Sequence, residues 1–224
     1  MPEFAVQRRF PRFPIKLPVL YKVLEPKAGK PGVGWTRDLS EGGACLELAD
    51  RLEASTVLWV LLRSDLGGLE LTGRIVWVGG PAAGQGGVAH GLSFERMGPN
   101  QQEALRKLLM QHKVQLRQEG VRVPLEISIK CQPKGGTGQI VEGRTGDISR
   151  GGMLLHLPIA IPPPTALKVW IPTPRGIVEA EGEIAWMEPL EGGAPGRIIR
   201  HGFRFTEISW PNQLTLGLLL AGAP

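Results

Sequence analysis

The sequence predicts a mainly β protein made of two homologous domains. Its 224 residues include 31 Gly and 20 Pro, a composition that favours many turns and few long helices. Hydrophobic residues make up 42% of the chain and charged residues only 21%, which is typical of a globular protein with a buried core. The stretch Asp38–Gly43 (DLSEGG) recurs as Asp147–Gly152 (DISRGG), so we expect the chain to be a duplication.

The strands of the first half are predicted from runs and alternation of apolar residues between turn signals. A loop rich in Gly and Pro, from Pro26 to Gly34, separates the first strand from the chain that enters DLSEGG. Gly73 lies within a long alternating strand, where a barrel wall could bend. The predicted strands are Val19–Leu24, Ala44–Leu48, Val57–Leu62, Leu69–Val78 and His90–Phe94.

A helix is predicted to follow these strands and to end the first unit. Pro99 suits the first turn of a helix, because a backbone N–H there has no partner within the helix. One face of this helix would carry Leu105, Leu108, Leu109 and His112.

The second half repeats these features in the same order at a nearly constant offset. The offset is 110 residues from Arg12 to Arg122 and 109 residues from Asp38 to Asp147. It grows to 112 at the start of the second helix, and the insertions fall in loops, where length can vary without disturbing strand register. We therefore expect two domains, residues 1–114 and 115–224, each ending in a helix.

The repeated DxSxxG stretch describes a tight polar turn. Asp38 and Ser40 can hydrogen-bond to nearby backbone N–H groups, and the glycines allow a positive φ. The same carboxylate, hydroxyl and bare backbone would also suit a ligand. Taken alone, the pattern leaves both interpretations open.

The positive charge of the chain is concentrated near its beginning. The formal net charge is +5, and the first 30 residues carry seven Lys or Arg against two Glu. Arg8, Arg9 and Arg12 lie among prolines, which favour an extended segment. Such a segment could be a solvated tail, a contact for nucleic acid or an acidic membrane, or an anion site.

Two motifs in the first half together carry a family resemblance. RxxxR at Arg8 and Arg12, followed by DxSxxG at Asp38, Ser40 and Gly43, resembles the PilZ domain. The later stretches GRIVW (73–77) and HGLSF (90–94) are similar to the closing strands of that family. The resemblance implies two tandem six-stranded antiparallel β-barrels, each followed by a C-terminal helix. It also implies a bacterial receptor for cyclic di-GMP.

The chemistry of the motif residues agrees with such a ligand, which carries two phosphates and two guanines. Arginine can bind phosphate or the guanine O6 and N7 atoms bidentately, and its flat face can stack on a base. Aspartate can accept from the guanine N–H donors, and glycine lets backbone approach closely. The nucleotide-binding residues that we expect in the first domain are Arg8, Arg9, Arg12, Asp38, Ser40, Gly42 and Gly43.

The second domain keeps the turn but has only part of the arginine motif. Arg122 aligns with Arg12, but Gln118 stands where the resemblance implies an arginine. Arg117 could substitute through a bulge, although an extended chain would point it to the opposite side. Arg150 replaces Glu41 and adds positive charge. A candidate second nucleotide site would use Arg117, Arg122, Asp147, Ser149 and Gly152.

Other conspicuous side chains have structural interpretations. Trp77 and Trp186 alternate with Ile75 and Ile184, which predicts that they point into the barrels and lie outside the site. His90 and His201 are equivalent, and each precedes Gly-x-x-Phe without neighbours that would form a metal site. Cys45 and Cys131 occupy non-equivalent positions and are expected to be reduced and buried.

The sequence thus predicts a cytoplasmic, non-enzymatic receptor of cyclic di-GMP with no metal, cofactor or membrane span. Ligand binding, chiefly in the first domain, would order the arginine segment and change the domain arrangement or the binding of an unidentified downstream protein partner. The alternative is a nucleotide-independent protein-interaction adaptor. Nucleic-acid binding ranks last, because it usually needs exposed aromatic residues and this chain has a single Tyr and few Phe.

Overall fold

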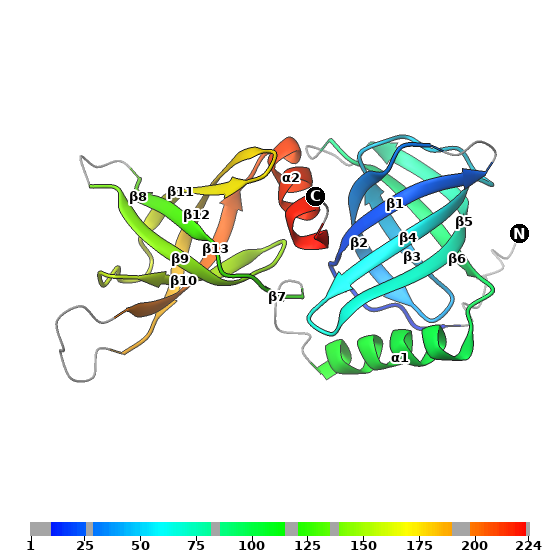
Figure 1. Cartoon of the computed structure of the whole chain (residues 1–224), viewed down its shortest axis with the longest axis horizontal. Coiled ribbons are helices and arrows are strands. Elements are labelled where there is room, and N and C mark those ends of the chain that lie inside the picture. Colours follow the sequence, from blue (N-terminus) through cyan, green and yellow to red (C-terminus); the bar gives the residue numbers. More distant parts are fainter. Residues whose placement is uncertain are drawn as a thin grey trace, which may run out of the picture.

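A computed structural model of the chain shows two β-barrels with one helix between them (Figure 1). The structure describes residues 10–25, 29–81, 86–114, 121–134, 139–189 and 198–222. Arg8, Arg9, Arg117 and Gln118, on which part of the predicted site depends, lie outside these residues.

The first barrel is formed by six antiparallel strands whose order closes on itself as β1-β2-β3-β6-β5-β4. Each strand falls where the sequence alternates, and the turns between strands fall at Gly-rich or polar stretches. Helix α1, Pro99–Val114, lies below this barrel (Figure 1). The strands are β1 Pro18–Glu25, β2 Gly32–Ser40, β3 Gly43–Leu48, β4 Val57–Ser64, β5 Gly67–Pro81 and β6 Val88–Glu95.

The second barrel repeats this topology. Its strands follow the order β10-β13-β12-β11-β8-β9, and pairing of β9 with β10 closes the barrel. The short strand β7, Val123–Pro124, adds to the edge of β9, and helix α2, Trp210–Ala221, ends the domain. The other strands are β8 Ser128–Pro133, β9 Val141–Ile148, β10 Gly152–Leu157, β11 Ala166–Thr173, β12 Gly176–Met187 and β13 Ile199–Glu207. The predicted fold of two barrels, each with a following helix, is therefore confirmed.

The two hydrophobic cores interlock across the domain boundary. Leu105, Leu108 and Leu109 of α1 join the core of the first barrel, as the helical spacing predicts. The core of the second barrel includes Leu216 and Leu220 of α2, together with Trp35 from strand β2 of the first barrel. Neither core is completed by its own strands alone.

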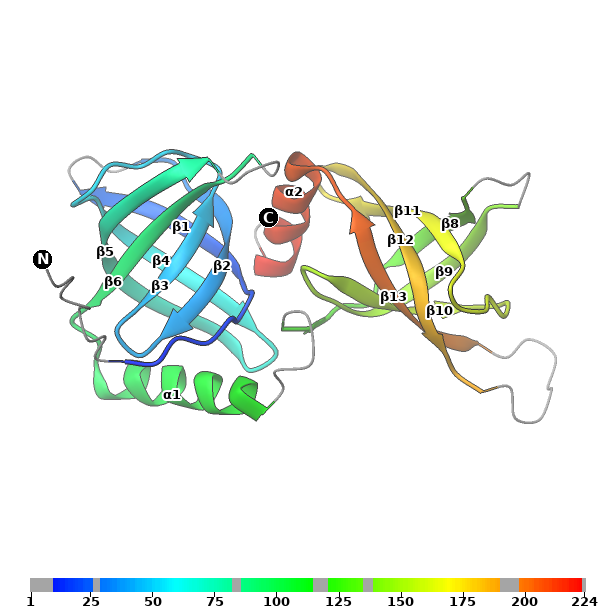
Figure 2. The same ribbon diagram turned by 180° about the vertical axis from the view of Figure 1, so that it is seen from behind.

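Helix α2 lies between the barrels, as both views show (Figures 1 and 2). It contacts β11 and β12 of its own barrel and β1, β2 and β4 of the other. Its sequence, WPNQLTLGLLLA, is apolar nearly all round, whereas α1 carries charged residues on an outer face. Four residues of α2 are buried, Leu216, Gly217, Leu220 and Ala221, and most of the others are half-buried. No helix among the described residues is both long and apolar enough to cross a membrane.

Candidate functional site

A two-residue bridge brings Arg12 to the first polar turn. Phe13 and Leu39 exchange backbone hydrogen bonds of 2.9 Å each, which places the preceding residues of the two segments side by side. Arg12 Nη1 then donates to Asp38 Oδ1 at 3.1 Å. The two side chains are 34% and 29% exposed, so this ion pair lies at the surface, where a ligand can reach it. Arg12 of the RxxxR motif therefore lies beside Asp38 of the DxSxxG motif, as predicted.

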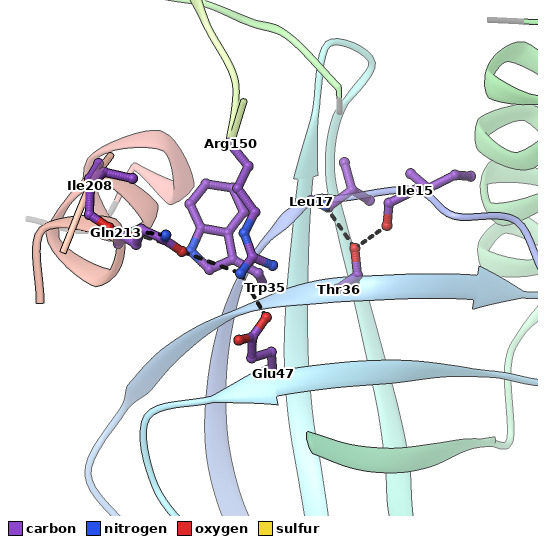
Figure 3. Close-up of polar contacts among 8 residues, drawn as sticks. All are labelled: Ile15, Leu17, Trp35, Thr36, Glu47, Arg150, Ile208 and Gln213. Atoms are coloured by element: carbon purple, nitrogen blue, oxygen red, sulfur yellow. Dashed lines mark hydrogen bonds and ion pairs between the residues drawn. The ribbon is translucent and has the colours of Figure 1, made fainter. Parts of the chain in front are cut away.

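A buried threonine holds the segment that carries Arg12. The Thr36 hydroxyl accepts from Leu17 N at 2.7 Å and donates to the Ile15 carbonyl oxygen (Figure 3). Thr36 is fully buried, so these bonds fix the path of the incoming chain against strand β2. Thr145 does the same in the second domain, where its hydroxyl contacts Ile127 N and the Leu125 carbonyl. Sequence reasoning missed both threonines, although they precede each DxSxxG motif at the same distance.

A β-bulge turns Asp38 out of the barrel wall. Residues two apart on a strand normally share a face, and Thr36 points inward. The pairing of β2 with β3 shifts between Thr36 and Asp38, so Arg37 is an extra residue and Asp38 faces outward. The same shift separates Thr145 from Asp147 in the second domain. The bulge therefore separates an anchoring residue from a surface carboxylate.

The remaining residues of the first DxSxxG motif have structural partners. The Ser40 hydroxyl donates to the Gly43 carbonyl at 3.0 Å, and Ser40 is buried. A Cβ at Gly43 would lie 2.1 Å from the Leu92 carbonyl oxygen, so a larger residue would force strands β3 and β6 apart. A Cβ at Gly42 would meet the Phe10 ring at 2.8 Å. These residues shape the turn, while Asp38 supplies its exposed charge.

The prediction that Trp77 and Trp186 point into the barrels is wrong. Ile75 and Ile184 are fully buried, but Trp77 is 40% exposed and Trp186 is 47% exposed. A register shift lies between each isoleucine and the tryptophan that follows it, so a bulge again sends the second residue to the outer face. Alternation along the sequence does not reveal the extra residue.

Cross-strand register places each tryptophan in the same row as the aspartate of its domain. In the first barrel, Asp38 pairs with Cys45, Cys45 with Gly91, and Gly91 with Trp77. A Cβ at Gly91 would lie 1.9 Å from Trp77 Nε1, so the indole lies directly over this glycine. The first domain therefore presents a carboxylate and a half-exposed indole on one outer face.

The second domain repeats this arrangement. Arg122 Nη1 donates to Asp147 Oδ1 at 2.7 Å, and strand β7 holds Arg122 in place as the bridge at Phe13 holds Arg12. The Ser149 hydroxyl donates to the Gly152 carbonyl at 3.1 Å. The outer row runs through Asp147, Leu154, Gly202 and Trp186. The pairing of Arg122 with Asp147 confirms that Arg122 is the counterpart of Arg12.

A cavity of about 630 Å³ lies beside this second row. Its lining includes Arg122, Asp147 and Ser149 together with Trp186, Arg200 and Arg204. The motif comparison identified the first three residues but neither arginine of strand β13.

Arg150, in the second turn, serves the domain interface. Its Nη2 contacts Glu47 Oε2 of the first barrel at 2.7 Å, and the two side chains are only 10% and 3% exposed. Its guanidinium lies 5.5 Å from the centre of the Trp35 ring, whose Nε1 donates to the Gln213 carbonyl of α2 at 3.2 Å (Figure 3). The positive charge that Arg150 was expected to add is therefore paired with Glu47 across the interface.

The equivalent histidines have structural roles, as predicted. His90 Nδ1 donates to the Val88 carbonyl and its Nε2 accepts from Leu52 N at 3.0 Å. His201 makes the same two contacts with Ile199 and Ile161. Burial lowers the pKa of both rings, because the neutral form is favoured away from water.

Both cysteines are free and buried, as predicted. Burial raises the pKa of Cys131 to about 11. Burial, and to a smaller extent the charge of Asp38, raises the pKa of the Cys45 thiol. Cys45 therefore lies beside Asp38 as a neutral thiol. No group of three or more His, Cys, Asp or Glu side chains that could hold a metal ion occurs within the described part of the chain.

Several known proteins are similar to this chain. The isolated PilZ domain of CeSA, from a cellulose-synthesising bacterium, is 23% identical and covers 46% of this chain and 98% of its own, with a TM-score of 0.36. MotI/DgrA, an inhibitor of motility from Bacillus subtilis, is 13% identical over 92% of this chain and 96% of its own, with a TM-score of 0.36. The PilZ domain of Escherichia coli YcgR, solved with c-di-GMP, is 12% identical over 50% of this chain and 95% of its own, with a TM-score of 0.42.

At the level of sequence, no curated protein matches the chain. The family model for the PilZ domain, in contrast, matches it twice, over residues 6–111 and 115–222. The two matches cover nearly the whole chain and coincide with the two barrels and their helices. The chain therefore belongs to the PilZ family and contains two PilZ domains in tandem.

Proposed function

We propose that the chain is a non-enzymatic receptor of cyclic di-GMP and that its first domain is the principal binding site. Membership of the PilZ family supports the ligand class. The observation that carries the proposal is the outer row that joins Asp38 to Trp77, with Arg12 paired to Asp38 at its edge. The second domain has the same row, so the choice of the first domain as the principal site rests on its complete RxxxR motif. Arg8 would complete the arginine pair of the motif in this domain.

The chemistry of the row suits a guanine nucleotide. The Asp38 carboxylate accepts from the guanine N1 and N2 groups, and the Trp77 indole offers a flat surface for a base. Arg12 would leave Asp38 and bind a phosphate or a guanine edge bidentately. The exposed ion pair with Asp38 is worth at most about 1 kcal/mol, so this exchange costs little.

Binding would act on the rest of the molecule through the arginine segment. The ligand gathers Arg8, Arg9 and Arg12 around the site, and ordering this segment favours one arrangement of the domains or one state of a partner surface. The ligand shifts the equilibrium only by its difference in affinity between the two arrangements. The downstream protein partner would recognise the ligand-bound arrangement.

Calorimetric titration of the full chain with cyclic di-GMP tests the proposal. Removing the Arg12 guanidinium in Arg12→Ala should weaken binding by roughly ten- to a hundredfold, because charge-assisted hydrogen bonds are worth about 1.5–3 kcal/mol. Arg12→Lys should recover only part of this loss, because lysine cannot bind bidentately.

Arg63→Ala is the matched control, since Arg63 is an exposed arginine on strand β4. It should bind as the unmodified chain does. Absence of binding heat from the unmodified chain would refute the receptor proposal. It would favour the alternative of a nucleotide-independent adaptor, which the internal hydrogen bonds of Ser40 and Ser149 support.

A further inference from the structure

We propose that the second domain contains its own site for a purine nucleotide with two phosphates, in which Arg200 and Arg204 replace the arginine that is missing at position 118. The proposal rests on the proposed function for the class of ligand. Its location rests on the cavity that Arg122, Asp147 and Trp186 share with these two arginines.

Strand β13 presents the two arginines on one face. Every second residue of this part of the strand, at positions 200, 202 and 204, points to the outer face of the barrel. The side chains of Arg200 and Arg204 are 60% and 56% exposed. At about 3.3 Å per residue, their Cα atoms are roughly 13 Å apart, the spacing that RxxxR has on an extended chain. The sequence Arg200-His-Gly-Phe-Arg204 is itself an RxxxR pattern.

The indole of Trp186 lies between these two arginines. A Cβ at Gly202 would be 2.0 Å from Trp186 Nε1, so the ring lies directly on the glycine that separates Arg200 from Arg204. The strand therefore offers a flat aromatic surface with a guanidinium on either side. A purine base can stack on such a surface while the guanidinium groups bind phosphate.

The same cavity also contains the complementary group, Asp147. Asp147 is in the same cross-strand row as Trp186, and Arg122 is paired to it at 2.7 Å. Asp147 can accept from the N–H edge of guanine, which distinguishes guanine from adenine. The cavity, of about 630 Å³, falls in the size range of small-molecule sites.

The arginines of β13 are paired to acidic residues at the rim. Arg200 Nε donates to Glu188 at 3.0 Å, and Arg204 Nη2 donates to Glu183. These pairs lie at the surface, where ion pairs contribute little to stability. A phosphate can therefore exchange with the carboxylates, and Glu188 and Glu183 balance the charge of the two arginines.

The two domains differ in where they carry the arginine pair. In the first domain, Ala89 and Ser93 occupy the strand positions that correspond to Arg200 and Arg204, and the second arginine of the motif is Arg8 on the entering segment. The second domain carries Gln118 on its entering segment and two arginines on the barrel wall. The two arginines of the second site are therefore held by the barrel wall itself.

Fluorine NMR of the full chain labelled with 5-fluorotryptophan tests this inference. Trp77→Phe and Trp186→Phe assign the two resonances, one for each site. With cyclic di-GMP, we expect both resonances to shift in the unmodified chain. In Arg200→Ala/Arg204→Ala the shift of Trp186 should need at least about tenfold more ligand, while the shift of Trp77 should be unchanged.

The two proposals fail differently in this experiment. Arg12→Ala should weaken the response of Trp77 and leave that of Trp186 intact. A shift of Trp77 with no shift of Trp186 would overturn the second site and leave the proposed function standing. A shift of Trp186 alone would leave the second site and the receptor function standing and would overturn the assignment of the principal site to the first domain.

Two further measurements test whether the variants fold and which nucleotide binds. Arg200→Lys/Arg204→Lys keeps the charge and the rim ion pairs, and it should give intermediate affinity with an unchanged melting temperature. Titration with GTP and with the linear dinucleotide pGpG distinguishes the sources of the same chemistry. If GTP or pGpG shifts the Trp186 resonance at lower concentration than cyclic di-GMP does, the site is supported and assigned to a linear nucleotide. If the arginine variants bind every ligand as the unmodified chain does, the roles of Arg200 and Arg204 are overturned.

Discussion

The Arg12–Asp38 contact depends on residues that do not themselves reach the ligand site. Thr36 is fully buried and joins Leu17 to Ile15 through one hydroxyl, and Thr145 does the same in the second domain. Each hydroxyl both accepts and donates, so neither valine nor serine reproduces its combination of bonds and packing. The threonine thus positions the arginine from inside the wall of the barrel.

We expect Thr36→Val to destabilise the chain and to weaken binding in the first domain. Valine keeps the shape but leaves the Leu17 N–H and the Ile15 carbonyl without their partner, at a cost of about 1–3 kcal/mol. Urea unfolding measures the stability, and calorimetry with cyclic di-GMP measures the binding.

Thr145→Val is the matched control, because it breaks the same pair of bonds in the other domain. It should lower stability by a similar amount without changing the affinity of the first site. Equal loss of that affinity in both variants would show that Thr36 acts through global stability rather than by positioning Arg12.

Individual residues also show how far the sequence could predict the site. The pairing of Arg12 with Asp38 follows from two motifs and is present. The positions of Trp77 and Trp186 could not be predicted, because one extra residue in a strand reverses the face of every residue after it. Arg200 and Arg204 form an RxxxR pattern in the sequence, but the pattern alone does not place them on the same outer face as Asp147, one strand away across β10.

At the scale of elements, strands and helices were predictable while their partners were not. Val33 and Trp35 on β2 are buried beneath α2, whereas the equivalent positions on β9 carry the exposed Glu142 and Arg144. The same strand therefore binds a helix in one barrel and faces water in the other. The apolar run Leu214–Ala223 is too short to span a membrane, and the contacts of its helical part, up to Ala221, with both barrels account for its composition.

Substitution of Gly217 tests how closely α2 packs on the first barrel. A Cβ there would lie 3.3 Å from Val33 and 3.4 Å from Trp35, so Gly217→Ala should have a small net effect. The tight contact offsets the gain in helix propensity. Gly217→Leu has no room for its side chain and should destabilise the chain by about 1–3 kcal/mol.

The readouts are urea unfolding and the radius of gyration from small-angle scattering. The leucine variant should expand as the helix moves away from Val33, and the alanine variant should keep the native dimensions. A stable, compact leucine variant would contradict the close contact of α2 with strand β2.

At the scale of the whole molecule, an ion pair fixes the second turn to the first barrel. Arg150 and Glu47 are almost completely buried, and the second carboxylate oxygen of Glu47 has no hydrogen-bond partner among the described residues. A buried charge without its partner is strongly destabilising, whereas removing both charges can be nearly neutral. The pair therefore favours one relative placement of the domains.

A double-mutant cycle measures this coupling. Arg150→Met and Glu47→Leu should each lower the free energy of unfolding by about 3–5 kcal/mol if they leave the other charge buried. The double variant should cost clearly less than the sum of the two. Additive losses in urea unfolding would mean that the contact between Arg150 and Glu47 contributes no coupling between the domains.

The burial of α2 on both faces also constrains how the chain is synthesised. Trp35 leaves the ribosome long before Leu216, by roughly 10 to 40 s at about 5–20 residues per second. During that interval the face of β2 that α2 later covers remains open to water, and the second core lacks its last two leucines. The two domains cannot mature strictly one after the other, because α2 of the second domain covers Val33 and Trp35 of the first. Nascent-chain chaperones would therefore meet the first barrel while its Trp35 face is still apolar and uncovered.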